Sequence, residues 1–207
     1  VYYTYAFTRN GNTAETIDIY ARSAGVNGRR GMVLDLRTTD PEGWERDRQV
    51  ALGDYTDAVI YELHVRDFSS DESGNFTLRG KFGAFCEKAV NGFGETIGLD
   101  YIKKLGVTHI HLLPVSDYQS VDESDPDAGF NWGYDPLNYN IPEGSYSTDP
   151  HHGEVRVREF KQLIQAAHER GIGIIMDVVY NHTYATEDSP FNKTYPRYYL
   201  SLIHISE

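Results

Sequence analysis

Three short apolar runs, separated by helical segments, constrain the fold of this 207-residue chain more than any other feature. The runs are "DAVIYELHV" (57–65), "VTHIHLLPV" (107–115) and "IGIIMDVVYNH" (172–182). A compact, nearly continuous apolar run is typical of a strand that is buried on both faces of a parallel sheet. The sequence therefore predicts an α/β fold with three buried parallel strands.

Two segments with helical spacing lie between these runs. They are "TIGLDYIKKLG" (96–106) and "EVRVREFKQLIQAAHERG" (154–171), and each closes on a glycine. Strand, helix, strand, loop, helix and strand in this order predict right-handed crossovers, which a doubly wound sheet and a (β/α)8 barrel both satisfy. The stretch after the first strand has no glycine-rich phosphate fingerprint, and this disfavours a nucleotide-binding fold.

Residues 1–53 have a different pattern of apolar residues, in which no helical period occurs. "YYTYAF" and "GMVLDL" are predicted to be strands, and "RNGN" supplies an Asn-Gly turn. "TTDPEGWERD" (38–47) is predicted to be a linker because it carries proline and glycine. We therefore place a domain boundary between residues 53 and 54.

The composition of the chain narrows the classes of molecule that it can be expected to bind. A net charge of −12 argues against a nucleic-acid backbone as ligand, and no apolar run is long enough to cross a bilayer. The sixteen tyrosines fit a sugar-binding surface, although strand positions in a sandwich explain them equally well. Cys86 is the only cysteine, so we expect a small buried apolar side chain there. A single cysteine does not indicate the cellular compartment of the protein.

Polar side chains follow the predicted strands at the point where each strand ends, which is where barrel enzymes place their sites. Asp177, Asn181 and His182 come with the third strand, Tyr134 and Asp135 lie in the loop after the second, and the first ends in "HVRDF" with His64, Arg66 and Asp67. His109 and His111 share one face of the second strand. We expect them to fill the interior, with a metal pair as the alternative.

Several of these stretches together resemble the α-amylase superfamily of glycoside hydrolases, and within it the type I pullulanases. They are "YELHVRDFS", "GVTHIHLLPVSDY", "FNWGYDPLNYNIPEGSYSTDP" and "DVVYNHTY". The resemblance implies that 54–200 form about the first three strands of a (β/α)8 barrel, and that 1–53 form the end of a preceding β-sandwich. Asp18-Ile19-Tyr20-Ala21 stands where many relatives have Asp-Pro-Tyr-Ala, a difference that concerns a local turn. Residues 201–207 do not continue the pattern and are expected to be a non-native tail.

The resemblance also implies a reaction, the hydrolysis of α-1,6-glucosidic linkages in pullulan, branched starch or glycogen with retention. Such hydrolysis needs two carboxyl groups about 5 Å apart, and the family motifs that carry them do not occur here. We therefore expect no catalytic residue in this chain, and an inactive piece of a larger enzyme. An isoamylase, a glycogen branching enzyme and a noncatalytic α-glucan-binding protein are the alternatives.

The matched positions imply roles for six side chains. Tyr134, Asp135 and His182 are expected to bind substrate, while Asp177, Asn181 and Trp132 are expected to support the site. The expected partner is an α-glucan, with no nucleic acid and no membrane. No cofactor is expected, with calcium at Asn181 as the alternative, because one amide oxygen does not make a calcium site of six to eight ligands.

Overall fold

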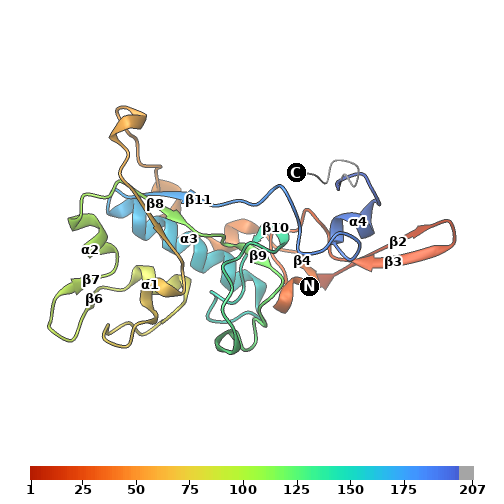
Figure 1. Cartoon of the computed structure of the whole chain (residues 1–207), viewed down its shortest axis with the longest axis horizontal. Helices are drawn as coiled ribbons and strands as arrows, with labels where there is room; N and C mark the ends of the chain where they lie inside the picture. The colour runs from red at the N-terminus through yellow and green to blue at the C-terminus, as the bar shows by residue number, and fades with distance from the viewer. Residues whose placement is uncertain (201–207) are drawn as a thin grey trace.

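The computed structural model of the chain describes residues 1–200 (Figure 1). The predicted non-native tail, 201–207, lies outside the described residues. Among the described residues, no helix has both the length and the apolar character needed to span a bilayer.

A three-stranded parallel sheet forms the centre of the fold, as the three apolar runs predict. The strands lie in the order β11-β8-β5, and His109 is paired with Ile60 on one side and with Gly173 on the other. Helices α2 and α3 lie in the crossovers between the strands. The bounds are β5 Ile60–Leu63, β8 His109–Leu112, β11 Gly173–Met176, α2 Leu99–Lys104 and α3 Gly153–Glu169. Within residues 1–200 the sheet does not close into a barrel, and the other sheets have two strands each.

The main core lies between this sheet and α3. Ile110 and Leu112 on β8 and Leu163 on α3 are completely buried. Phe82 and Phe85, in the turn of 3₁₀ helix η5 (Phe82–Cys86), fill the space beneath α3 and are also completely buried. Each such side chain contributes roughly 1.5–3 kcal/mol relative to an exposed one. This packing fixes the orientation of the sheet, and with it the loops at the carboxyl ends of its strands.

The prediction that these strands are buried on both faces is wrong for the described residues. Ile60 on β5 is 56% exposed, and the Glu62 side chain is 61% exposed. The pairing places Glu62 beside His111 and Ile175, so these three share the face opposite to the one that carries Ile110. Only the face toward α3 is covered within residues 1–200. The helix predicted at 96–106 is also shorter, because β7 (Thr96–Ile97) occupies its first residues.

The N-terminal residues form two small antiparallel sheets. A hairpin of β2 (Tyr5–Arg9) and β3 (Asn12–Thr16) projects at the end of the molecule opposite to α2 (Figure 1). Its turn is the predicted one, with positive φ at Asn10 (50°) and Gly11 (79°). Strand β1 (Tyr2–Tyr3) pairs with β4 (Gly31–Met32), so the strand predicted for "GMVLDL" ends after two residues.

The predicted linker is docked against α3. Two 3₁₀ helices, η2 (Leu36–Thr39) and η3 (Trp44–Arg46), lie in or beside it. Lys161 Nζ donates to the Leu36 carbonyl at 2.8 Å, and His168 Nδ1 lies 2.8 Å from an Asp47 carboxylate oxygen. Side chains of α3 therefore hold the segment in place.

The long loop after β8 contains an antiparallel pair, β9 (Ser116–Tyr118) and β10 (Pro136–Pro142), with register shifts between its rungs. The remaining elements are η1 Val26–Gly28, η4 Tyr55–Asp57, α1 Asp67–Ser70, β6 Ala89–Val90, η6 Pro126–Ala128 and α4 Pro190–Thr194. The loop between β9 and β10 carries "NWGYDP". It thus places this motif next to the carboxyl ends of the parallel strands.

Candidate functional site

Two residues that lie 48 positions apart in the sequence meet at the carboxyl end of the sheet, through the side chain of His182 and the backbone of Tyr134. His182 Nε2 lies 2.7 Å from the Tyr134 carbonyl oxygen. Tyr134 Oη donates to Asp177 Oδ2 at 2.7 Å. Since a carbonyl only accepts, His182 is protonated at Nε2. The structure therefore brings together Tyr134, His182 and Asp177, as the sequence predicts.

The bend that presents Tyr134 is held by the polar side chains around it. Asn131 Nδ2 donates to Asp135 Oδ1 at 2.7 Å, and Asn131 Oδ1 accepts the Gly133 N–H at 2.8 Å. The second Asp135 oxygen accepts the Ser120 N–H at 2.8 Å. Gly133 has φ +88°, and a Cβ there would lie 2.8 Å from the Pro114 side chain, so only glycine fits this bend. Asp135 thus orients the loop through both of its oxygens.

Two of the expected supporting residues lie at the surface. Trp132 is 58% exposed, and its ring stands edge-on to Phe130 with centroids 5.7 Å apart. Asn181 is exposed as well. Its neighbour His182 is anchored through the backbone, because Tyr139 Oη donates to the His182 carbonyl at 2.8 Å. Trp132 is therefore more exposed than a residue that only buttresses the loop.

The electrostatics at Tyr134 favour a phenol that donates. Burial, and then the hydrogen bond to Asp177, raise the pKa of Tyr134 to about 12. His111 continues the polar chain, with Nε2 3.7 Å from Asp177 Oδ2 and Nδ1 3.4 Å from Glu62 Oε2. The second histidine of the predicted pair, His109, instead lies with Nδ1 3.0 Å from Thr108 Oγ1. The two histidines thus have separate polar neighbours.

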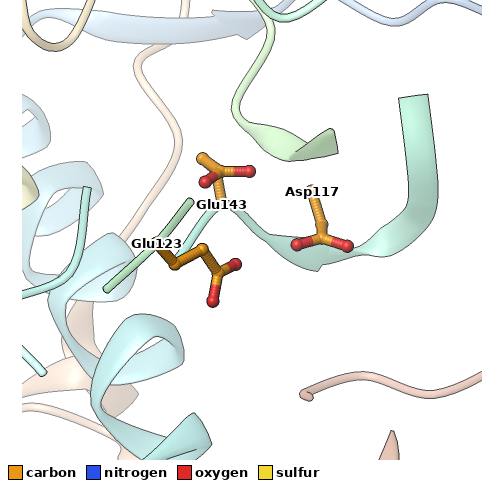
Figure 2. A group of neighbouring side chains, drawn as sticks. All are labelled: Asp117, Glu123 and Glu143. Carbon is orange, nitrogen blue, oxygen red and sulfur yellow. The ribbon is translucent and has the colours of Figure 1, made fainter. Parts of the chain in front are cut away.

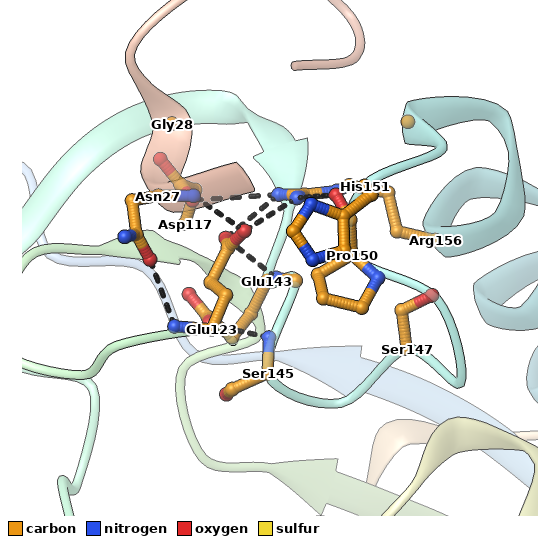
Figure 3. Close-up of polar contacts among 12 residues, drawn as sticks. Asn27, Gly28, Asp117, Glu123, Glu143, Ser145, Ser147, Pro150, His151 and Arg156 are labelled. Atoms are coloured by element: carbon orange, nitrogen blue, oxygen red, sulfur yellow. Dashed lines mark hydrogen bonds and ion pairs between the residues drawn. The ribbon is translucent and has the colours of Figure 1, made fainter. Parts of the chain in front are cut away.

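A buried acidic group lies beneath the loop, and the sequence analysis missed it. Asp117, Glu123 and Glu143 place carboxylate oxygens within 4.8 Å of one another, and Figure 2 shows them around a common centre. Arg156 of α3 closes this group from one side. It donates to both Glu123 oxygens, at 2.9 and 2.7 Å, and its Nη1 lies 3.6 Å from Asp117 Oδ1 (Figure 3). All three acidic residues lie in the predicted loop after the second strand, where carboxylates are ordinarily solvated, so no signal in the sequence distinguishes them.

Burial dominates the titration of this group. It raises the pKa of Glu143 to about 7, assisted by the charge of Glu123, while backbone N–H groups lower it. The pKa of Asp117 lies well above its usual range, first because of burial and then because of the charges of Glu143 and Glu123. Three ionised carboxylates beside one guanidinium would leave two uncompensated negative charges. The group therefore holds protons that exposed carboxylates would release at neutral pH.

By ligand type these carboxylates could hold a metal ion such as calcium, but their oxygens are already engaged. Glu143 accepts the backbone N–H groups of Tyr118 and Ser145, at 3.0 and 2.8 Å. Glu123 accepts from Arg156, and among the three acidic side chains only Asp117 Oδ1 has no hydrogen-bond partner within residues 1–200. A calcium ion needs six to eight oxygen ligands. The donor set fits the guanidinium that fills it and does not fit calcium.

Comparison with known proteins places the chain in a family. The family description "Alpha amylase, catalytic domain" matches residues 85–198, more than half of the chain. The chain belongs to the α-amylase family.

Relatives within the α-amylase family include pullulanases. A pullulanase of Bacillus subtilis is 43% identical over 198 residues, which are 95% of this chain and 27% of that protein. The crystal structure of apo pullulanase from Paenibacillus barengoltzii superposes with a TM-score of 0.94 at 51% identity, covering 96% of this chain and 31% of that one. Isoamylase 1 of rice is 35% identical over 61% of this chain and 15% of that protein. The chain thus spans less than a third of the length of each of these relatives.

Proposed function

We propose that this chain supplies the substrate-binding wall of an enzyme that hydrolyses α-1,6-glucosidic linkages in pullulan, branched starch or glycogen, with retention at the anomeric carbon. The wall is the surface formed by Tyr134, Asp135 and His182, with Trp132, Asp177 and Asn181 supporting it. The observation that carries the proposal is the contact of Tyr134 with both His182 and Asp177 at the carboxyl edge of the sheet. Pullulanases match 95–96% of the chain, which supports the same activity. Structures of Paenibacillus barengoltzii pullulanase variants contain maltotetraose and maltotriose, which supports an α-glucan as ligand.

Each residue of the proposed site has its own role in binding the sugar. Tyr134 is 41% exposed as a residue, its ring offers a flat face for a sugar, and the Asp177 hydrogen bond fixes the direction of that ring. His182 Nδ1 meets sugar hydroxyls. Asp135 orients the bend, and Trp132 and Asn181 border it. This wall binds and aligns the sugar.

The bond cleavage itself is assigned to residues outside these 207. A retaining glycosidase needs a nucleophile and an acid/base about 5 Å apart. Asp177 is a carboxylate at a strand end, but it accepts the phenol of Tyr134 and lies beside His111. We therefore keep Asp177 in a supporting role and predict no catalytic residue in this chain, which on its own is expected to be inactive.

A segment exchange tests the proposal. Residues 1–199 replace the matching segment of Paenibacillus barengoltzii pullulanase, and release of maltotriose from pullulan is measured. The chimera is expected to be active, and Tyr134→Ala to lower its kcat/KM by roughly tenfold, since an aromatic contact contributes about 0.5–1.5 kcal/mol. Tyr55, which is 95% exposed, is the matched control, and Tyr55→Ala should change nothing.

The outcomes separate the alternatives. In the chimera the host supplies the catalytic carboxylates, so the reaction class is tested on the full-length parent of this chain. A parent that cleaves branched amylopectin but leaves pullulan intact would favour an isoamylase, and transfer of chains without release of reducing ends would favour a branching enzyme. A parent that binds maltotriose but cleaves no α-glucan would favour a noncatalytic α-glucan binder. Equal activity of the chimera and its Tyr134→Ala variant would remove Tyr134 from the site.

A further inference from the structure

His64, just after strand β5, is a buried histidine for which the binding wall described above has no role. It is 4% exposed, and its ring packs against Phe130 with centroids 4.8 Å apart. Its Nε2 lies 3.0 Å from the Asn131 carbonyl oxygen and 3.0 Å from Tyr146 Oη. Its Nδ1 lies 3.2 Å from the backbone nitrogen of Arg66. Both ring nitrogens therefore have partners inside the protein.

These partners fix the protonation state of the ring. The Arg66 N–H only donates, so Nδ1 of His64 accepts and carries no proton. The Asn131 carbonyl only accepts, so Nε2 carries the proton. A second proton on Nδ1 would face the Arg66 N–H and break that hydrogen bond. The geometry thus admits the neutral imidazole and excludes the imidazolium.

The Asn131 carbonyl connects His64 to the wall. Asn131 is the residue whose side chain holds both Gly133 and Asp135, so its placement sets the bend that presents Tyr134. A shift of the Asn131 backbone would be passed on to the Tyr134 ring over three residues. His64 contacts this backbone from the residue that directly follows β5.

We propose that His64 is a positioning residue for the sugar-binding wall: in its neutral, Nε2-protonated form it holds the Asn131 carbonyl and so fixes the bend that carries Tyr134. The role in sugar binding rests on the function proposed above, while the anchoring of the bend does not. A second proton enters at Nδ1 and faces the Arg66 N–H, so the ring is driven from this contact. The displaced ring shifts the Asn131 carbonyl that it holds, and the wall loses order as the solution is acidified.

The surroundings of His64 agree with this direction. Burial is the largest influence and lowers the pKa of His64 below its ordinary 6.5, and the charge of Arg66 lowers it as well. The hydrogen bond to Asn131 and the charge of Asp67 act in the opposite direction. The phenol of Tyr146 faces the ring from the loop after β10, and Glu62 lies two residues earlier in β5. The loss of order is therefore expected below pH 6.5.

Two substitutions of His64 distinguish the effect of its hydrogen-bond donor at Nε2 from the effect of the charge that the ring gains at low pH. In His64→Gln the amide nitrogen reaches the place of Nε2 and donates to Asn131, but it does not titrate. In His64→Leu the volume is kept and the donor is lost. His152 is exposed at the surface beside Asp149, so His152→Gln is the matched control.

The experiment follows the Gly133 amide resonance by NMR from pH 8 to pH 5, and measures maltotriose affinity over the same range. In the unsubstituted chain and in His152→Gln, the Gly133 resonance is expected to titrate together with the His64 ring. Maltotriose affinity should fall by roughly two- to tenfold, which corresponds to the loss of one hydrogen bond. His64→Gln should show neither change, and His64→Leu should bind weakly at every pH.

A Gly133 resonance that titrates equally in His64→Gln, or that is unchanged in His64→Leu, overturns the proposal. If Gly133 follows His64 as expected but maltotriose does not bind at any pH, the anchoring of the bend stands. That result overturns the role in sugar binding together with the proposed function. The two failures are therefore distinguishable in one set of samples.

Discussion

Removing the guanidinium of Arg156 should be among the most destabilising single changes in the described chain. Its side chain is completely buried, and its partner Glu123 is 2% exposed, so solvent screens this pair very little. At an effective dielectric constant of 20, two unit charges about 4 Å apart attract by about 4 kcal/mol. Breaking a buried pair by deleting one partner costs about 3–5 kcal/mol, because the other charge stays behind uncompensated.

Arg156→Met is the chosen change, because methionine keeps most of the apolar stem. We expect the free energy of unfolding to fall by about 3–5 kcal/mol at pH 7.5, measured by urea titration with tryptophan fluorescence. For a chain of this size that corresponds to a melting temperature lower by roughly 6–20 °C. Arg156→Lys keeps the charge and loses the two-pronged contact with Glu123, so its loss should be smaller.

The pH dependence distinguishes lost charge compensation from a simple cavity. Without Arg156 the folded state holds protons on its buried carboxylates that the unfolded state releases. Stability therefore falls as pH rises, and the cost of Arg156→Met should shrink from pH 8 to pH 5. A cavity would cost the same at both values. A loss below about 1 kcal/mol at pH 7.5, or a loss independent of pH, would refute the reasoning.

Further changes test the same buried group and its neighbourhood. Burial and the neighbouring acids hold the pKa of Asp117 high in the folded state, so stability is lost as pH rises above its ordinary 3.8. Asp117→Asn removes this loss and should become more stable relative to the parent as pH rises from 5 to 8, measured by thermal unfolding; parallel curves would contradict it. Gly28 has φ +60°, and a Cβ there would lie 2.2 Å from Asp117 Oδ2, whereas Gly11 has φ +79° with nothing within 4 Å. Gly11→Ala should therefore cost only the backbone strain of about 1–2 kcal/mol, and Gly28→Ala distinctly more in the same urea assay; equal losses would show that the loop around Asp117 yields.

The sequence predicted the elements whose pattern is local. The Asn-Gly hairpin turn, the long helix α3 and the three parallel strands follow from spacing within short windows, and the structure contains all of them. The meeting of Tyr134 and His182 could also be predicted, since both follow strands whose carboxyl ends lie at one edge of a sheet. Their roles toward a sugar remain predictions.

The features that were missed depend on contacts between distant segments. The ion pair of Glu123 and Arg156 joins a loop to a helix 33 positions later, and neither residue differs in its local pattern from a solvated one. The docking of 36–47 on α3 is similar, because proline and glycine in that segment indicate a turn but not its surface contacts. Tertiary burial, which a short window of sequence does not contain, decides both.

The wrong prediction that the strands are buried on both faces has a different cause, because the sequence itself contains the alternation that contradicts it. In "VTHIHLLPV" the histidines alternate with Ile110 and Leu112, and a period of two assigns them to opposite faces of a strand. Glu62 occupies the same face one strand over, paired with His111. This face therefore carries Glu62 and His111 beside Ile175, and it is not uniformly apolar. It leads directly to Asp177, Tyr134 and the proposed wall, so the alternation that was read as a uniform apolar run marks the side of the sheet on which substrate is expected.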